Sequence, residues 1–312
     1  MTFFEFLSRF STEKAAIDYF FNARYHNILT CNHCGAKIKV YKDRKRAKVC
    51  HCHNCDNTFS PFTDTIFEKS STDMRKWFYA IHLVLNDKKG ISACQLQREL
   101  GVMYKTSWRM LRLIRETMGN EDMTKAFQCF VEIDETYIGG RPRKQNLKLD
   151  KNGKPITVPK SKRGRGTDKT PVVGVKERGT NRVYAQVALP NEQGQKLTGK
   201  QLMAILDKVC KDGTTVASDD FKSYGILDRK DVKRFIHVTV NHSLGQFSAG
   251  NGVQTNNIEN FWSLIKRQWV GTHHHYSIKY MQGYIDEMCF RQNNRENNRS
   301  FDTLLERCVL AA

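Results

Sequence analysis

The stretch FVEIDETYIGG at residues 130–140 alternates apolar and polar side chains, which is the period-two pattern of a β-strand with one buried face. Asp134 falls in the middle of this strand on the same face as Glu132, and Glu135 falls on the opposite face. An acid inside an apolar strand costs free energy unless it is paired or bound to a metal ion. The stretch therefore predicts a strand and marks Asp134 as a candidate functional residue.

The segments after this strand alternate strand-like and helical patterns. Strand-like segments are PVVGVKE (171–177), RVYAQVALP (182–190), TTVAS (214–218) and RFIHVTV (234–240), and helical patterns cover 198–210, 256–269 and 277–295. This order predicts an α/β domain with a mixed sheet. Between the first two strands, residues 141–166 hold ten Lys or Arg and one Asp. We expect them to form a loop that becomes ordered on DNA, with a solvated insertion as the alternative.

Helices are expected before the strand-rich region, at 11–25 and 72–85. Two further helical patterns, at 91–100 and 105–118, are joined at Gly101 by the short glycine-bearing turn of a helix-turn-helix. The second helix is expected to expose cations at helical spacing for contact with a DNA major groove, namely Lys105, Arg109, Arg112 and Arg115. A solvated basic face on an ordinary helical hairpin is the alternative.

The cysteine spacing predicts a metal site. Two C-x2-C pairs, Cys31–Cys34 and Cys52–Cys55, are separated by 17 residues, as in a zinc ribbon. Each pair puts two thiolates on one tight turn, and two such turns make the four-sulfur cage that a structural Zn²⁺ prefers. Replacement ligands among Cys50, His51 and His53, or simple burial of the thiols, are the alternatives. The basic segment 37–50 between the pairs is expected to form a hairpin.

The amino-acid composition indicates which class of partner the chain binds and in which compartment it is expected. The 312 residues include 51 Lys or Arg and 32 Asp or Glu, for a net charge of +19. An excess of this size favours a polyanionic partner, with nucleic acid ahead of an anionic membrane surface. No apolar run reaches the roughly 18 residues that a membrane span needs, and the N-terminus lacks the features of an export signal. We therefore expect an intracellular protein.

Three carboxylates occupy positions that suit catalysis. Asp219 directly follows the strand TTVAS, and Glu259 opens the helix at 256–269. Together with Asp134 they would supply oxygen ligands for two Mg²⁺ ions about 3.5–4 Å apart, as in phosphodiester chemistry. Lys266 lies seven residues after Glu259 and is expected to hold a DNA phosphate. As alternatives, Asp219 would cap the next helix and Glu259 would complete a capping box with Asn256.

Other reaction classes lack support, because the chain has no G-x-S-x-G elbow, no Walker loop and no G-x-G-x-x-G fingerprint. Acyl transfer, nucleotide hydrolysis and dinucleotide redox chemistry are therefore disfavoured.

A set of short motifs runs through nearly the whole chain. They are CNHC, CHNC, FSPFTDTIF, ISACQLQRELGVMYKTSWRM, VEIDETYIGG, SDDFKSY, VNHS, QTNNIENFWSLIKR, GTHHH and YIDEMCFRQNNR. In this combination the chain resembles the ISXO-like insertion-sequence transposases, a zinc-ribbon-bearing branch of the DDE transposases related to the Merlin transposons. Gln254 stands where that family often has a histidine, and Asp220 beside Asp219 leaves the second acid ambiguous by one residue.

The resemblance implies a ribonuclease-H-like catalytic domain with the acidic triad Asp134, Asp219 and Glu259, accompanied by Lys266 and using Mg²⁺ or Mn²⁺. It also implies a structural Zn²⁺ and a zinc ribbon and helix-turn-helix that bind the terminal inverted repeats. The expected segments are 1–65 (helix and zinc ribbon), 66–122 (helix-turn-helix region), 123–296 (catalytic domain) and 297–312 (tail helix).

The expected partners are double-stranded DNA, as transposon ends and target, and further copies of the chain, as a homodimer or higher oligomer on DNA. No membrane is expected to be a partner. The compartment would be the bacterial cytoplasm or nucleoid for a bacterial element and the nucleus for a eukaryotic one. The leading hypothesis is a transposase that cleaves and joins DNA strands. A zinc-dependent DNA-binding regulator and a nuclease or resolvase that cuts without joining are the alternatives.

Overall fold

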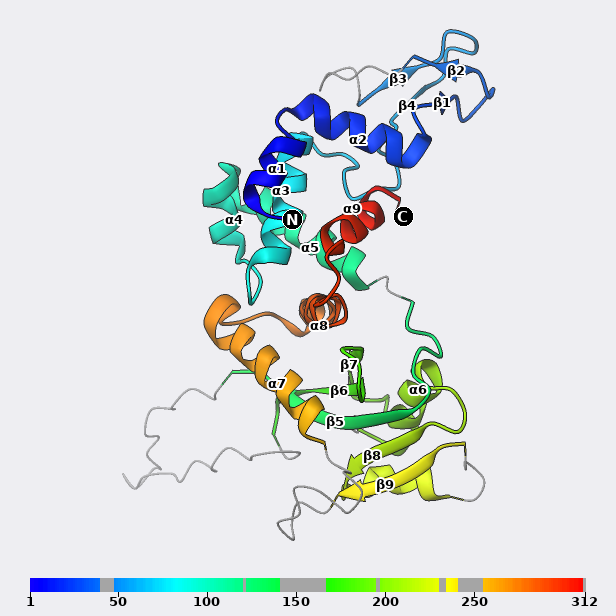
Figure 1. Ribbon diagram of the computed structural model, residues 1–312, viewed down its shortest axis with the longest axis vertical. Helices are drawn as coiled ribbons and strands as arrows, with labels where there is room; N and C mark the ends of the chain where they lie inside the picture. The colour runs from blue at the N-terminus through cyan, green and yellow to red at the C-terminus, as the bar shows by residue number, and fades with distance from the viewer. Residues whose placement is uncertain are drawn as a thin grey trace, which may run out of the picture. The chain divides into compact units, whose positions relative to one another are not determined.

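The computed structural model describes residues 1–39, 48–119, 122–140, 167–194, 197–229, 234–240 and 255–310 (Figure 1). The chain forms two compact units: Met1–Glu121 together with Asp286–Ala312, and Asp122–Ile285. The basic segment 141–166 and the motif residues 241–243 and Gln254 lie outside the described residues. None of the described helices combines the length and apolarity that a membrane crossing requires.

The first unit is built from helices and four very short strands. Its elements are α1 (Phe3–Arg9), α2 (Glu13–Tyr25), β1 (Leu29–Thr30), β2 (Lys37–Ile38), β3 (Cys50–His51), β4 (Thr58–Phe59), α3 (Met74–Asn86), α4 (Ala93–Leu100), α5 (Tyr104–Gly119) and α9 (Ser300–Leu310). The core joins apolar residues of α1, α2, α3, α5 and α9, and it is rich in phenylalanine. The helix expected in the C-terminal tail is therefore part of the core of this unit.

The two helices predicted on either side of Gly101 are present as α4 and α5. Ser92 caps α4 by accepting a hydrogen bond from the Gln95 N–H over 3.1 Å. Gly101 ends the helix with φ +59°, a left-handed conformation that glycine adopts without strain. The Ser107 hydroxyl on α5 then bonds the Ala93 carbonyl oxygen over 2.9 Å, which fixes the second helix against the first.

The predicted hairpin over residues 37–50 is wrong for its described part. β2 pairs with β1 and β3 pairs with β4, so the segment 37–50 contributes strands to two different hairpins. Each C-x2-C pair lies between the two strands of one hairpin. The spacing is therefore explained by two similar hairpins placed 21 residues apart, with β1 and β3, and likewise β2 and β4, at that offset.

The second unit is a five-stranded mixed sheet with helices. Its elements are β5 (Phe130–Ile138), β6 (Thr170–Glu177), β7 (Val183–Val187), α6 (Gly199–Val209), β8 (Thr215–Asp219), the 3₁₀-helix η2 (Lys222–Asp228), β9 (Ile236–Val240), α7 (Asn256–Gln268) and the π-helix η6 (Trp269–His273). The helix α8 (Ile278–Asn293) begins in this unit and ends in the first.

The strand order β7-β6-β5-β8-β9 makes the sheet ribonuclease-H-like. β5, β6 and β7 form an antiparallel meander, and β8 and β9 run parallel to β5. Because side chains alternate along a strand, Val131 and Ile133 of β5 join the core with α6, while Glu132 and Asp134 point to the opposite face. α7 packs against β5 and β6 on that opposite face, as the contacts below show.

Candidate functional site

Two of the three predicted acids lie side by side on neighbouring parallel strands. β5 and β8 are paired in parallel up to Glu132 and Ala217. Two residues further along each strand come Asp134 and Asp219, at the same level of the sheet and on the same face. Both carboxylates are partly buried. The strand register thus brings these two acids together.

The environment of Asp134 disfavours its ionised form. Burial is the largest cause, and it raises the pKa of Asp134 to about 7, with the charges of Glu135 and Asp219 acting in the same direction. Trp262 Nε1 on α7 donates a hydrogen bond to Asp134 Oδ2 over 3.0 Å, which acts the other way. A bound cation would relieve this cost by stabilising the carboxylate. Asp134 could therefore supply an oxygen ligand to a divalent metal ion.

Asp219 also supports the turn that follows it. Its Oδ1 accepts a hydrogen bond from the Phe221 N–H over 3.0 Å, directly before η2. The N-cap of η2 is Phe221 and has no side-chain cap, so the helix cap suggested as an alternative for Asp219 is wrong, and Asp219 supports only the turn before the helix. Asp219 is the last residue of β8, whereas its neighbour Asp220 lies outside the strand and is exposed.

Glycine 174 makes room for the tryptophan that contacts Asp134. Gly174 on β6 is paired directly with Asp134 on β5. A Cβ atom added at Gly174 would lie 2.5 Å from Trp262 Cη2 and 3.0 Å from Ile258 Cδ1. The indole therefore occupies the space that any larger residue at position 174 would need.

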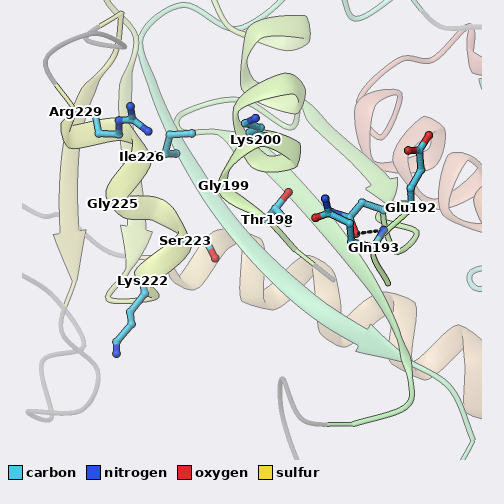
Figure 2. A pocket seen from close by; sticks show the side chains of 11 residues that line it. Glu192, Gln193, Thr198, Gly199, Lys200, Lys222, Ser223, Gly225, Ile226 and Arg229 are labelled. Atoms are coloured by element: carbon cyan, nitrogen blue, oxygen red, sulfur yellow. Dashed lines mark hydrogen bonds between the residues drawn. The ribbon is translucent and has the colours of Figure 1, made fainter. Parts of the chain in front are cut away.

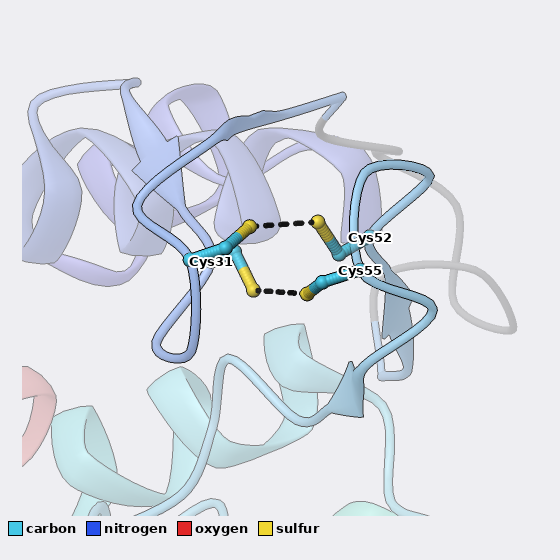
Figure 3. Close-up of side chains that lie close together, drawn as sticks. Cys31, Cys52 and Cys55 are labelled. Atoms are coloured by element: carbon cyan, nitrogen blue, oxygen red, sulfur yellow. Dashed lines mark hydrogen bonds between the residues drawn. The ribbon is translucent and has the colours of Figure 1, made fainter.

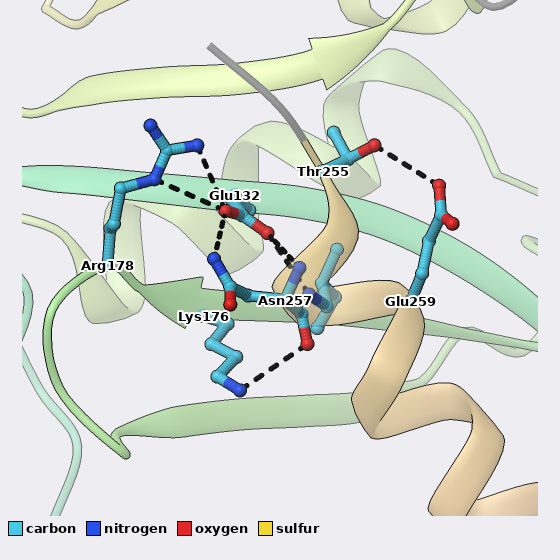
Figure 4. A network of polar contacts seen from close by, with 7 residues as sticks. Glu132, Lys176, Arg178, Thr255, Asn257 and Glu259 are labelled. Carbon is cyan, nitrogen blue, oxygen red and sulfur yellow. Dashed lines mark hydrogen bonds and ion pairs between the residues drawn. The ribbon is translucent and has the colours of Figure 1, made fainter. Parts of the chain in front are cut away.

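A buried acid, Glu132, anchors the beginning of α7 (Figure 4). Its Oε2 accepts hydrogen bonds from the backbone N–H groups of Asn257 and Ile258, over 2.9 and 3.1 Å. Its Oε1 accepts from Asn257 Nδ2 over 2.7 Å and from the Arg178 guanidinium over 3.0 Å. The Glu132 side chain is 0% exposed. A strand residue thus satisfies N–H groups at a helix N-terminus, which stabilises a negative charge there.

Glu259 follows this anchor on the first turn of α7. The helix N-cap is Thr255, so Glu259 is not at the third helical position, and the capping box with Asn256 suggested as an alternative is wrong. Thr255 Oγ1 instead donates a hydrogen bond to Glu259 Oε1 over 3.3 Å (Figure 4). Glu259 and Lys266 are both exposed on α7.

The three acids do not form a closed ligand set. In the part of the chain that the structure describes, the only group of at least three possible ligand residues with atoms within 4.8 Å of one another is the cysteine cluster. Asp134, Asp219 and Glu259 therefore share one region of the second unit without reaching mutual ligand distance.

The four predicted cysteines form a compact cluster in the first unit (Figure 3). Cys31 Sγ lies 3.6 Å from Cys55 Sγ, and Cys34 Sγ lies 3.5 Å from Cys52 Sγ. Gly35 after the first pair and Asp56 after the second both have positive φ, +73° and +54°, so the two turns are alike. The cluster could hold a tetrahedrally coordinated metal ion.

Backbone N–H groups favour the thiolate form of one cysteine of this cluster, Cys31. The N–H of Cys34 is the largest cause that lowers the pKa of Cys31, to about 6, and the His33 N–H acts in the same direction. A thiolate, rather than a thiol, is the form that binds metal. Cys50 lies on β3 outside the cluster, and burial raises the pKa of its thiol.

The cations predicted on α5 are not all available to DNA. Arg115 is only 5% exposed, and its Nε lies 2.7 Å from Glu287 Oε2 in a buried ion pair. The prediction that Arg115 is exposed is therefore wrong, because α5 turns this residue toward the interior of the unit. Arg109 is half-buried and donates to the Glu68 carbonyl oxygen over 2.7 Å. Lys105 is exposed, and Arg112 is partly exposed beside Glu116.

Sequence reasoning missed the residues that dock α7 on the sheet. The alternating pattern places Glu132 on the same face of the strand as Asp134. This shared face is the sequence feature that indicates burial of Glu132 near the acids. The glycine inside the apolar strand PVVGVKE was a signal for close approach by another group. The partner of that glycine, Trp262, is not readable from the pattern of α7 alone.

Comparison with known proteins gives consistent matches. Residues 127–293, more than half of the chain, match the family described as the ISXO2-like transposase domain. A protein described as an uncharacterized protein in transposable element ISH50, from Halobacterium salinarum, is 29% identical over 307 residues, which cover 96% of this chain and 98% of that protein. An uncharacterized transposase-like protein of Haemophilus influenzae is 35% identical over 115 residues, covering 37% of this chain and 84% of that protein.

Solved structures give a weaker likeness. The crystal structure of the Mos1 strand transfer complex aligns with 74% of this chain and 76% of its own, at 12% identity and a TM-score of 0.29. The Drosophila P element transposase strand transfer complex aligns with 79% of this chain and 63% of its own, at 12% identity and a TM-score of 0.27.

Proposed function

The chain belongs to the family with the ISXO2-like transposase domain, and we propose that it is a DDE-type DNA transposase that cleaves DNA at terminal inverted repeats and joins the freed strand to target DNA. The observation that carries the proposal is the pair Asp134 and Asp219, level with each other on one face of the sheet against which α7 packs. α7 also carries Glu259.

The three acids have distinct proposed roles. Asp134 and Asp219 would hold divalent metal ions, Mg²⁺ or Mn²⁺, and Glu259 would complete the site from α7. When bound, such ions activate an attacking oxygen and stabilise a leaving oxygen in phosphodiester chemistry. Asp219 is preferred to Asp220 because only Asp219 is level with Asp134. Closing the ligand set requires Glu259 to approach the other two acids, a movement that its exposed position on the first turn of α7 permits.

The remaining residues would bind and place DNA. Lys266, two turns along α7 from Glu259, would hold a DNA phosphate beside the site. Lys105 and Arg112 of the helix-turn-helix are the proposed contacts to the terminal repeat, since their side chains reach solvent. Structural Zn²⁺ in the cluster of Cys31, Cys34, Cys52 and Cys55 would fix the hairpins of the first unit.

The proposed oligomeric state follows from the substrate, because a transposon has two ends. Holding two transposon ends at once favours a homodimer or a larger assembly on DNA. We also propose the four segments expected from the sequence, with catalysis in 123–296. These segments divide the chain differently from the two compact units. The proposed compartment is the one that contains the DNA, either a bacterial nucleoid or a nucleus.

The test is a metal-dependent assay on DNA that carries the gene's own flanking sequences, with wild type compared with Glu259→Gln. We expect nicking at the repeat boundary and joined products with wild type, and loss of both with the variant. Tight DNA binding without nicking by either protein would instead favour a DNA-binding regulator. Efficient nicking without joined products would favour a nuclease.

A further inference from the structure

A hollow of about 820 Å³ lies where the first turn of α6 meets η2 (Figure 2). Among the described residues, its lining includes the cations Lys200, Lys222 and Arg229 and one carboxylate, Glu192. All four side chains belong to exposed residues. The hollow therefore has a net positive charge, which attracts an anionic ligand.

The floor of the hollow is rigid. Gly199 packs so closely on η2 that an added Cβ would lie 3.0 Å from the Ser223 carbonyl oxygen. The Ser223 hydroxyl donates to the Leu197 carbonyl oxygen over 3.0 Å, and this bond ties η2 to the segment before α6. A floor fixed in this way does not have to be ordered when a ligand binds, which reduces the entropy cost of binding.

The hollow lies next to the acid site along the chain. η2 begins three residues after Asp219, and its first residue is Lys222. Among the described residues, neither Lys200 nor Lys222 forms an ion pair with a carboxylate, so the structure does not neutralise these two charges. Lys222 thus presents an exposed ammonium group on the segment that directly follows the strand end carrying Asp219.

The lining favours phosphate over a base or an apolar ligand. None of the described residues that line the hollow is aromatic, so the hollow offers no ring on which a base could stack. Lysine and arginine side chains are the usual partners of backbone phosphates. We propose that this hollow is a second nucleic-acid site, which holds a backbone phosphate of the DNA strand next to the phosphodiester at the acids. The proposal rests on the function proposed above.

The experiment compares two double variants of the full chain that carry the same net charge. Lys200→Ala/Lys222→Ala removes two cations from the hollow. Lys208→Ala/Lys211→Ala removes two cations from the last turn of α6 and the segment after it, away from the hollow. Equilibrium binding to DNA with the gene's flanking sequences is measured as a function of salt concentration.

Each backbone phosphate contact contributes about 0.9 to the slope of log affinity against log salt. We expect the hollow variant to lose about 0.9 from the magnitude of this slope, the value for one phosphate contact, and the control to keep the slope of wild type. Equal slopes in wild type and the hollow variant, or equal losses in both variants, would overturn the proposal. So would binding of inorganic phosphate that the hollow variant loses while its slope on DNA is unchanged, because the hollow would then serve a free phosphate.

Failure of the proposed function has a different signature. Wild type that binds DNA but never nicks it with Mg²⁺ would contradict the transposase, while the slopes would still report on the hollow. Wild type that nicks normally, with unchanged slopes in the hollow variant, would contradict only the inference made for the hollow.

Discussion

Trp262 Nε1 lies 3.0 Å from Asp134 Oδ2, and this hydrogen bond joins the helix that carries Glu259 to the strand that carries Asp134. Together with the four donors gathered on Glu132, it fixes the beginning of α7 on the sheet. The position of Glu259 therefore depends on residues that are not themselves proposed ligands.

Gly174→Ala should destabilise the second unit by about 1–3 kcal/mol, because the new Cβ overlaps the Trp262 ring. Urea denaturation measures the change. Gly140→Ala is the matched control, since a Cβ there meets no atom within 4 Å. Adding Trp262→Phe should recover part of the loss caused by Gly174→Ala. Independent, additive effects of these two substitutions would show that the ring and the glycine are not coupled.

Glu132→Gln should lower the free energy of unfolding by about 3–5 kcal/mol, because it removes the charge that Arg178 and the α7 N-terminus share in a buried site. Glu192→Gln, at an exposed position, should change it by less than about 0.5 kcal/mol. Nicking by Glu132→Gln should fall even under conditions where the variant is folded. Nicking at the wild-type rate by the folded variant would show that Glu132 is not needed to position Glu259.

Stability without added divalent metal should fall as pH rises from about 4 to about 7. Asp134 has a folded-state pKa of about 7 against an ordinary value of 3.8, so the folded protein keeps a proton that the unfolded chain releases. The stabilisation is complete below pH 3.8 and is lost as pH passes 7. Calorimetry on wild type and Asp134→Asn measures this: the variant should lack this component, and equal pH profiles would contradict the raised pKa.

Arg115→Leu should cost about 3–5 kcal/mol of stability, because Glu287 would remain buried with one partner fewer. It should leave the salt dependence of DNA binding unchanged. Lys105→Ala should do the reverse, with little effect on stability and a reduced salt slope. A smaller slope of log DNA affinity against log salt for folded Arg115→Leu than for wild type would show that Arg115 does contact DNA.

Purified protein should contain about one zinc per chain. Cys52→Ser should lower the metal content and the melting temperature of the first unit, because metal binding is coupled to folding. Cys50→Ser is the control, since Cys50 lies outside the cluster, and it should retain the metal. Loss of zinc from Cys50→Ser with full zinc in Cys52→Ser would reassign the ligand.

Local patterns in the sequence predicted most elements of the fold. The alternation in FVEIDETYIGG and the glycine-bearing turn at Gly101 depend on neighbours within a few residues, so their signals survive in a single sequence. The sequence does not predict the helix α1, although Thr2 and Glu5 form a capping box, because seven residues are too few for a clear helical period. The pairing of β1 with β2 was also missed, since strands of two residues carry no periodicity.

The candidate site was predictable to the extent that its residues are chemically unusual. An acid in an apolar strand and paired cysteines both stand out against their surroundings. The burial of Arg115 did not stand out, because helical spacing defines faces of α5 without saying which face meets Glu287. The distance between Glu259 and the other acids also depends on how α7 docks, and the docking residues come from three separate segments of the chain.

The core of the first unit contains Phe301 of α9 beside Phe6 and Phe10 near the other end of the chain. The second unit, in contrast, is one continuous segment. During synthesis, the sheet of the second unit can therefore assemble while the first unit still lacks the helix α9. A nascent chain stopped before residue 300 would hold Asp134 and Asp219 in a finished sheet while the first unit still lacked α9. Synthesis itself thus orders the two units, with the helical unit completed last.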